Sequence, residues 1–163
     1  MKKEDIYKLL EEKGLWHEIT EHGAVWNMED LANLDLPYPE DDAKNIFVRD
    51  DKKRNYYLIT VKDDKRVDLK KFQSDYETRK LSFVSENDLM EKLELIPGSV
   101  SPFGLLNDKE KIVKFYLDED FLNSSTGIIG IHPNDNTATV WLKASDLLEI
   151  IKENGNEVNT IKL

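Results

Sequence analysis

Apolar residues recur along this chain at helical spacing in several segments. Ile6, Leu9 and Leu10 are spaced this way among Glu and Lys, and Gly14 follows where a helix commonly ends. Asp68 and Ser145 are candidate helix starts, while Ser85-x-x-Asp88 resembles a capping box. The predicted helices therefore cover residues 4–13, 27–34, 68–76, 85–93 and 145–151, with Asn154-Gly155-Asn156 ending the last.

Runs of β-branched and aromatic residues between polar turns predict strands. Residues 45–49 and 56–62 form the strongest pair, because the polar residues between them suit a hairpin. Other strands are expected at residues 16–21, 112–117, 127–131 and 137–142, with an edge strand at 158–163. Since most strands return through short turns, the pattern favours a mixed, largely antiparallel α+β sheet over a doubly wound parallel one.

Length and composition indicate one domain, residues 1–163, in a reducing environment. The absence of cysteine removes disulfides, thiolate zinc sites and thiol nucleophiles. The charged N-terminus has no continuous apolar segment after it, and no stretch approaches the roughly 18 apolar residues of a membrane helix. We therefore expect a cytoplasmic protein that neither enters a membrane nor is secreted.

The net charge of −10 argues against general nucleic-acid binding, which normally needs a basic face. Charge is uneven, however, because residues 44–80 hold 12 Lys or Arg against 7 Asp or Glu. One interpretation is that these cations are ordinary solvated faces of a hairpin and a helix. The other is a local basic surface on an acidic body.

The most constrained segment is Pro97 to Asp108, PGSVSPFGLLND, which contains two prolines and two glycines. Proline fixes φ, and glycine permits positive φ or close backbone approach, so this loop is predicted to hold one shape and bind something. Its GSVSP core is not a nucleophile elbow, because Pro102 replaces the final glycine; Ser99 and Ser101 are therefore interpreted as loop hydroxyls.

Other catalytic templates find no support in the sequence. Neither a Walker loop nor a dinucleotide-binding Gly-x-Gly-x-x-Gly motif occurs, so we expect no cofactor of those kinds. The histidines at 17, 22 and 132 lack the i, i+4 spacing of a helical metal site, so no metal is expected. Taken alone, Lys44 before an apolar run suits a solvated strand end, and His132 suits a turn residue.

Three motifs together change that interpretation. They are Lys44-Asn45-Ile46-Phe47-Val48-Arg49-Asp50, Gly98-x-x-x-Pro102 followed by Phe103-Gly104, and His132-Pro133-Asn134-Asp135-Asn136. In this order they resemble the YbaK/ProX (PrdX) prolyl-tRNA editing superfamily, over about residues 16–148. The likeness is closest to the freestanding branch (ProXp-ala type), which hydrolyses alanine mischarged onto proline tRNA. It implies a barrel-like core surrounded by helices.

The resemblance also implies a site. Lys44 would anchor the terminal phosphate or sugar of the tRNA, Asn45 would aid positioning, and His132 would limit the size of the amino acid. Amides of Gly98 and Ser99 would stabilise the oxyanion, with Pro102 fixing the loop. The remaining substrate-binding candidates are Val100, Ser101, Phe103, Asp118 and His22. This sequence departs from the family pattern at Gly23 and Trp26.

The implied partner is the acceptor end of tRNA(Pro), with prolyl-tRNA synthetase as a further candidate. Two alternatives stay open. The chain could edit another mischarged tRNA, such as Cys-tRNA(Pro) or a Ser-charged tRNA, or it could be a noncatalytic module that binds the tRNA acceptor.

Overall fold

Local capping signals set the ends of most helices in the computed structural model, which describes residues 1–24, 29–30 and 34–163. The Asp68 carboxylate accepts the Lys71 amide at 3.1 Å, and the Ser85 hydroxyl accepts the Asp88 amide at 3.1 Å. Gly155 ends the last helix with φ +102°. The helices are α1 (Lys3–Glu12), α3 (Leu69–Asp75), α4 (Glu86–Leu93), α5 (Asp120–Asn123) and α6 (Ala144–Asn154), with 3₁₀ turns η1 (Pro39–Asp41) and η2 (Pro102–Asn107).

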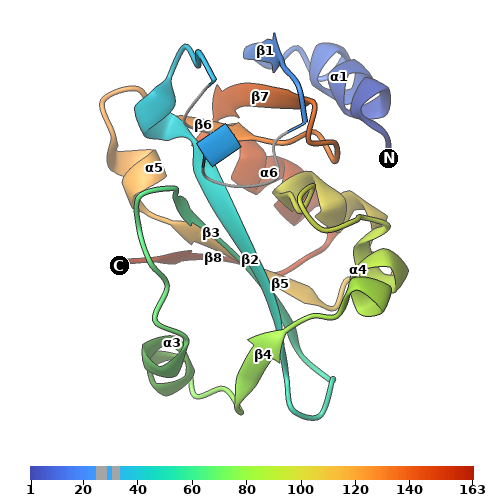
Figure 1. Cartoon of the computed structure of the whole chain (residues 1–163), viewed down its shortest axis with the longest axis vertical. Coiled ribbons are helices and arrows are strands. Elements are labelled where there is room, and N and C mark those ends of the chain that lie inside the picture. The colour runs from blue at the N-terminus through green and yellow to red at the C-terminus, as the bar shows by residue number, and fades with distance from the viewer. Residues whose placement is uncertain (25–28, 31–33) are drawn as a thin grey trace.

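The strands form two sheets in the described part of the chain (Figure 1). The strands are β1 (His17–Glu21), β2 (Ala43–Asp50), β3 (Tyr56–Lys62), β4 (Leu81–Phe83), β5 (Val113–Asp118), β6 (Ile128–Ile131), β7 (Ala138–Lys143) and β8 (Val158–Ile161). One sheet has the order β1-β7-β6 and is antiparallel. The other has the order β4-β2-β3-β5-β8, in which β3, β5 and β8 run parallel.

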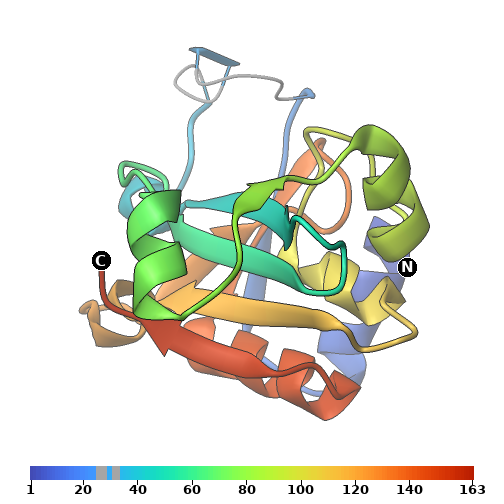
Figure 2. The ribbon, with the colours of Figure 1, turned by 90° about the horizontal axis from the view of Figure 1, so that it is seen from below.

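Each face of the longer sheet carries its own apolar core. The larger core lies between the two sheets and includes Phe47, Leu58 and Phe115 from one sheet and Ile129 and Val140 from the other. Helices α1, α4 and α6 and turn η2 close this core. The smaller core lies under α3, on the opposite face. It contains Val48, Tyr57, Ile59, Val61, Phe72, Leu81, Tyr116 and Ile161. Figure 2 shows the strands of the longer sheet stacked in order, with α3 and α6 on opposite sides.

The fold confirms the predicted α+β class with a mixed, largely antiparallel arrangement. The barrel-like part of the prediction is wrong, because the sheets of the described chain stay open and separate; only the bridge between Asp42 and Gly130 links them. The predicted loop 97–108 contains the 3₁₀ turn η2. The predicted helix through Met28 and Leu31, and Trp26, lie outside the described residues.

None of the described helices is long and apolar enough to cross a membrane.

Candidate active site

The loop between α4 and η2 has one fixed backbone shape. Gly98 adopts φ +89°, a positive value of the kind that the glycines of this loop were predicted to permit. The carbonyl of Ile96 accepts both the amide of Ser99, at 3.1 Å, and its hydroxyl, at 2.9 Å. The Ser99 amide is thus used within its own turn, and its predicted donation to a substrate, which stays a prediction, would require this bond to break. Within the described chain, the amides of Gly98 and Val100 have no acceptor.

Asn45 ties this loop to the longer sheet. Its side-chain amide donates to the carbonyl of Val100 at 3.2 Å, and its oxygen accepts the hydroxyl of the fully buried Thr60 at 2.6 Å. Asn45 lies opposite Thr60 in the pairing of β2 with β3, so the strand register sets both contacts. The predicted positioning role of Asn45 thus has a definite geometry: it holds the loop rather than a ligand.

Ser101 joins the same loop to the segment that carries His132. Its hydroxyl donates to the carbonyl of His132 and accepts the amide of Phe103 at 3.1 Å, which caps η2. Pro102 is buried in the first turn of η2, and Phe103 lies fully buried in the larger core. In this structure Ser101, Pro102 and Phe103 therefore support the loop from within, and their predicted contact with the substrate stays a prediction.

His132 lies against His22, with ring centroids 6.4 Å apart and planes at 64°. Nδ1 of His132 lies 3.1 Å from the carbonyl of Ala138; a carbonyl only accepts, so Nδ1 carries the proton and Nε2 has a free lone pair. By the same argument His22 donates from Nδ1 to Gly23, and its Nε2 accepts the hydroxyl of Thr139 at 3.0 Å. Burial lowers the pKa of His132, so its ring is neutral at pH 7.

Sequence reasoning missed this histidine pair and the role of Thr139. The two histidines are far apart in the chain, and the antiparallel pairing of β1 and β6 on either side of β7 brings them together. Alternation of polar Thr137 and Thr139 with apolar residues in the last long β-run was the available signal, because it places both hydroxyls on one face.

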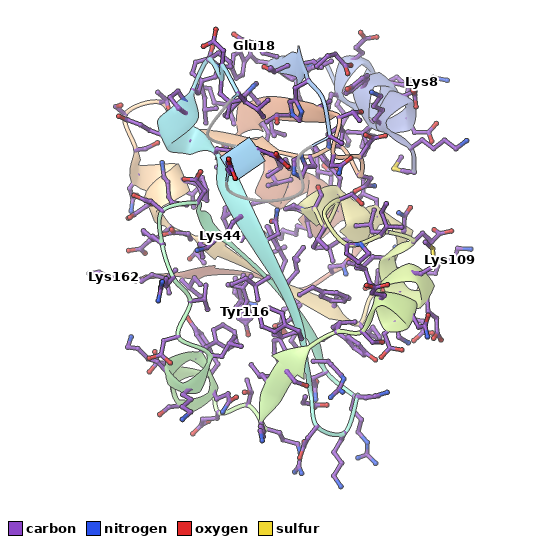
Figure 3. All side chains as sticks on the ribbon, in the orientation of Figure 1. Lys8, Glu18, Lys44, Lys109, Tyr116 and Lys162 are labelled. Carbon is purple, nitrogen blue, oxygen red and sulfur yellow. The ribbon has the colours of Figure 1, made fainter. Side chains whose placement is uncertain are left out.

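Lys44 lies on the other face of β2 from Asn45. Neighbouring strand residues alternate, and Lys44 is paired with Val61 of the smaller core. Figure 3 shows it on the side of the sheet that also carries Tyr116. In the part of the chain that is described, its ammonium has no hydrogen bond or ion pair. Burial raises the pKa of Asp63, and the charge of Lys44 partly offsets this rise.

Asp118 is engaged in contacts within the fold, and its predicted substrate-binding role stays a prediction. Its carboxylate is fully buried and lies 2.8 Å from the ammonium of Lys65. It also accepts the amides of Lys62 at 3.3 Å and Asp120 at 3.1 Å. These contacts fix the start of α5 and the chain after β3.

Asp42, just before β2, makes the stability of the fold depend on pH. Burial first, and then the charge of Asp63, raise its pKa to about 7 from an ordinary 3.8. The unfolded chain releases this proton near pH 4 and the folded chain only near pH 7, so stability falls as pH rises through that window. Between pH 4.5 and pH 8, the free energy of unfolding measured in urea should fall by roughly 2 to 4 kcal/mol less in Asp42→Asn than in the unmodified protein.

The exposed Asp64→Asn is the matched control and should retain the original slope. If Asp42→Asn shows the same fall in stability as the unmodified protein, the assignment to Asp42 is incorrect.

The described residues contain no group of three or more His, Asp or Glu that could hold a metal ion. The loop of Gly98 is held by Asn45, and the Ser101 hydroxyl joins it to the backbone carbonyl of His132, while two loop amides have no acceptor among the described residues. Such an arrangement can bind a carbonyl oxygen that gains negative charge.

Comparison with known proteins defines the class. A model of the aminoacyl-tRNA editing domain family matches residues 22–150. The chain therefore belongs to this family, a class of aminoacyl-tRNA deacylases, and the predicted resemblance is confirmed.

Individual relatives narrow the class to prolyl-tRNA editing proteins. The prolyl-tRNA editing protein ProX of Acetoanaerobium sticklandii is 38% identical over 161 residues, which cover 99% of this chain and 97% of that protein. The prolyl-tRNA synthetase associated domain-containing protein 1 of Mus musculus is 32% identical over 142 residues, 86% of this chain and 83% of that protein. A crystal structure of a candidate trans-editing enzyme for prolyl tRNA synthetase has a TM-score of 0.70 at 20% identity, with 99% of this chain and 96% of that one covered; this likeness shows the fold.

Proposed function

We propose that this chain, as a single editing domain over residues 1–163, hydrolyses the ester of Ala-tRNA(Pro) that is not bound to the synthetase. One observation carries the proposal. The loop amides of Gly98 and Val100 have no acceptor in the described chain, and Asn45 and Ser101 hold this loop beside His132. The curated relative named for prolyl-tRNA editing, which covers almost the whole chain, supports tRNA(Pro) as the substrate.

The reaction needs little protein chemistry, because an aminoacyl ester is already activated. Water adds to the carbonyl carbon, the carbonyl oxygen becomes an oxyanion, and collapse of this intermediate expels the ribose oxygen, which takes up a proton. The neighbouring ribose hydroxyl can orient the water. The amides of Gly98 and Val100 would donate to the oxyanion, so neither serine is needed as a nucleophile.

His132 acts in this proposal as a wall of the amino-acid pocket. A neutral ring adds bulk without charge, and its bond to Ala138 fixes the ring plane. Binding alone distinguishes small side chains by only about 10- to 200-fold per methylene, so a second site that admits alanine and excludes proline is an effective sieve.

The tRNA would reach the site across cations that have no ion pair among the described residues. Several basic residues between 44 and 80 are already paired with acids, including Lys62 with Asp41 and Arg79 with Asp51. The described cations in that range without an ion pair are Lys44, Arg49, Lys52, Arg54, Arg66, Lys70 and Lys80. Binding through these residues should weaken as salt rises. Prolyl-tRNA synthetase is the proposed supplier of the substrate.

The test is a panel of mischarged tRNAs with purified protein. Ala-tRNA(Pro) should be deacylated at least about 10-fold faster than Pro-tRNA(Pro), because the pocket would exclude the two additional ring carbons of proline. Cys-tRNA(Pro) and a Ser-charged tRNA complete the panel. Equal rates on the alanyl and prolyl esters, or no hydrolysis of either, would contradict the proposal, and a faster rate on Cys-tRNA(Pro) would favour the other editing activity.

A further inference from the structure

Helix α1 is bonded to the chain between β6 and β7, just beyond His132. The ammonium of Lys3 donates to Thr137 Oγ1 at 3.0 Å and lies 3.1 Å from Glu21 Oε2. The side-chain amide of Asn134 donates to the carbonyl of Met1 at 3.2 Å. Lys3 is only 22% exposed, so its ammonium is held against this segment rather than left in solvent.

The segment that Lys3 contacts holds both site histidines. The carbonyl of Thr137 accepts the backbone amide of His22 at 2.9 Å. The next carbonyl, of Ala138, accepts Nδ1 of His132, and the hydroxyl of Thr139 donates to His22 Nε2. Ala138 and Thr139 thus orient the two rings, while Thr137 holds the backbone of His22, and Lys3 is bonded to the side chain of Thr137.

The same hydroxyl links Lys3 to an acidic neighbour. Both the amide and the hydroxyl of Thr137 donate to Asp135 Oδ1. These bonds lower the pKa of Asp135, and the charge of Lys3 acts in the same direction. Lys3, Thr137 and Asp135 therefore form one charge-assisted chain of bonds, which is more rigid than a single neutral contact.

Nothing in α1 itself favours a lysine at this position. Lys3 is the first residue of the helix, where the positive end of the helix dipole disfavours a cation. Methionine and lysine have similar helix propensities, so the helix would form as well without the charge. The family model begins at residue 22, so α1 lies outside it.

We propose that Lys3 is a positioning residue: through Thr137 it holds His22 and His132 in the arrangement that selects the aminoacyl group. This inference rests on the proposed editing function. It extends that function to α1, whose described hydrogen bonds and ion pairs do not reach residues 97–101 or Lys44. Ahead of the helix, the amino group of Met1 donates to Asn107 at the end of η2.

Lys3→Met is the central variant, and Lys8→Met is its control on the same helix. Lys8 projects from α1 away from the molecule, and its ion pair with Glu12 is exposed (Figure 3). Lys3→Met should lower the ratio of alanyl to prolyl deacylation by about 5- to 10-fold. The variant should change kcat more than it changes KM. Lys8→Met should leave the ratio unchanged, and Lys3→Arg should restore most of it because a donor cation remains.

A second readout does not depend on activity. Long-range ¹H–¹⁵N spectra report which nitrogen of each histidine carries the proton, and His132 should show one Nδ1-protonated form in the unmodified chain and a mixture in Lys3→Met. Urea unfolding identifies any variant that is simply misfolded; Thr137→Val then replaces Lys3→Met, since it removes the same acceptor and leaves α1 intact.

Unchanged discrimination and unchanged His132 spectra in a folded Lys3→Met protein would overturn the inference. If the unmodified protein deacylates no tRNA, the proposed function fails, and the histidine spectra alone decide whether Lys3 positions the rings.

Discussion

Replacing Gly98 with alanine is expected to reduce deacylation of Ala-tRNA(Pro) by about 100-fold or more. Gly98 has φ +89°, a conformation that a β-carbon disfavours, so the turn around Ser99 must change shape. The amides of Gly98 and Val100 would then no longer point where the oxyanion forms. Loss of one such donor costs about 100- to 1000-fold in other acyl-transfer enzymes. Single-turnover kinetics with the purified variant measure the loss.

Gly14→Ala is the matched control for this variant. Gly14 also has positive φ, +66°, and a β-carbon there would meet nothing within 4 Å. Both substitutions should lower the free energy of unfolding by a similar amount, about 1 kcal/mol, because each places a β-carbon on a residue with positive φ. Only Gly98→Ala should lose activity. An active Gly98→Ala protein would remove this loop from the reaction.

Replacing Lys44 with alanine should lower kcat/KM by about 100-fold while weakening tRNA binding by only about 2- to 5-fold. Lys44 is half-buried, lies on the face of β2 opposite Asn45 and has no ion pair in the described chain, so the terminal phosphate of the tRNA would gain a charge-assisted contact there. One phosphate contact among many contributes little to overall affinity. The measurement compares single-turnover rates with filter-binding affinities for the same tRNA.

Lys109→Ala is the control for Lys44→Ala, because Lys109 is an exposed cation without an ion pair among the described residues and lies outside the basic segment 44–80. This variant should change neither the deacylation rate nor the tRNA affinity by more than about twofold. Equal losses of binding and deacylation in Lys44→Ala would favour the noncatalytic binding module, and a fully active Lys44→Ala protein would exclude the lysine from the site.

Features set by neighbouring residues could be read from the sequence. The caps at Asp68 and Ser85, the positive φ of Gly98 and Gly155 and the hairpin of β2 and β3 all follow from residue types within a few positions of each other. The three motifs, taken in order, also identified the editing family. Local geometry is encoded locally, because steric limits on φ and nearby hydrogen-bond donors act over a few bonds.

The tertiary structure alone decided which of these residues act together. It paired His22 with His132, tied Asn45 to Val100 through the register with Thr60, and used the Ser99 amide within its own turn. It also made β3, β5 and β8 parallel and buried Asp118, Ser101 and Phe103. These outcomes depend on contacts between residues far apart in the chain, where burial and strand register, rather than residue type, determine whether a side chain supports the fold or faces a ligand.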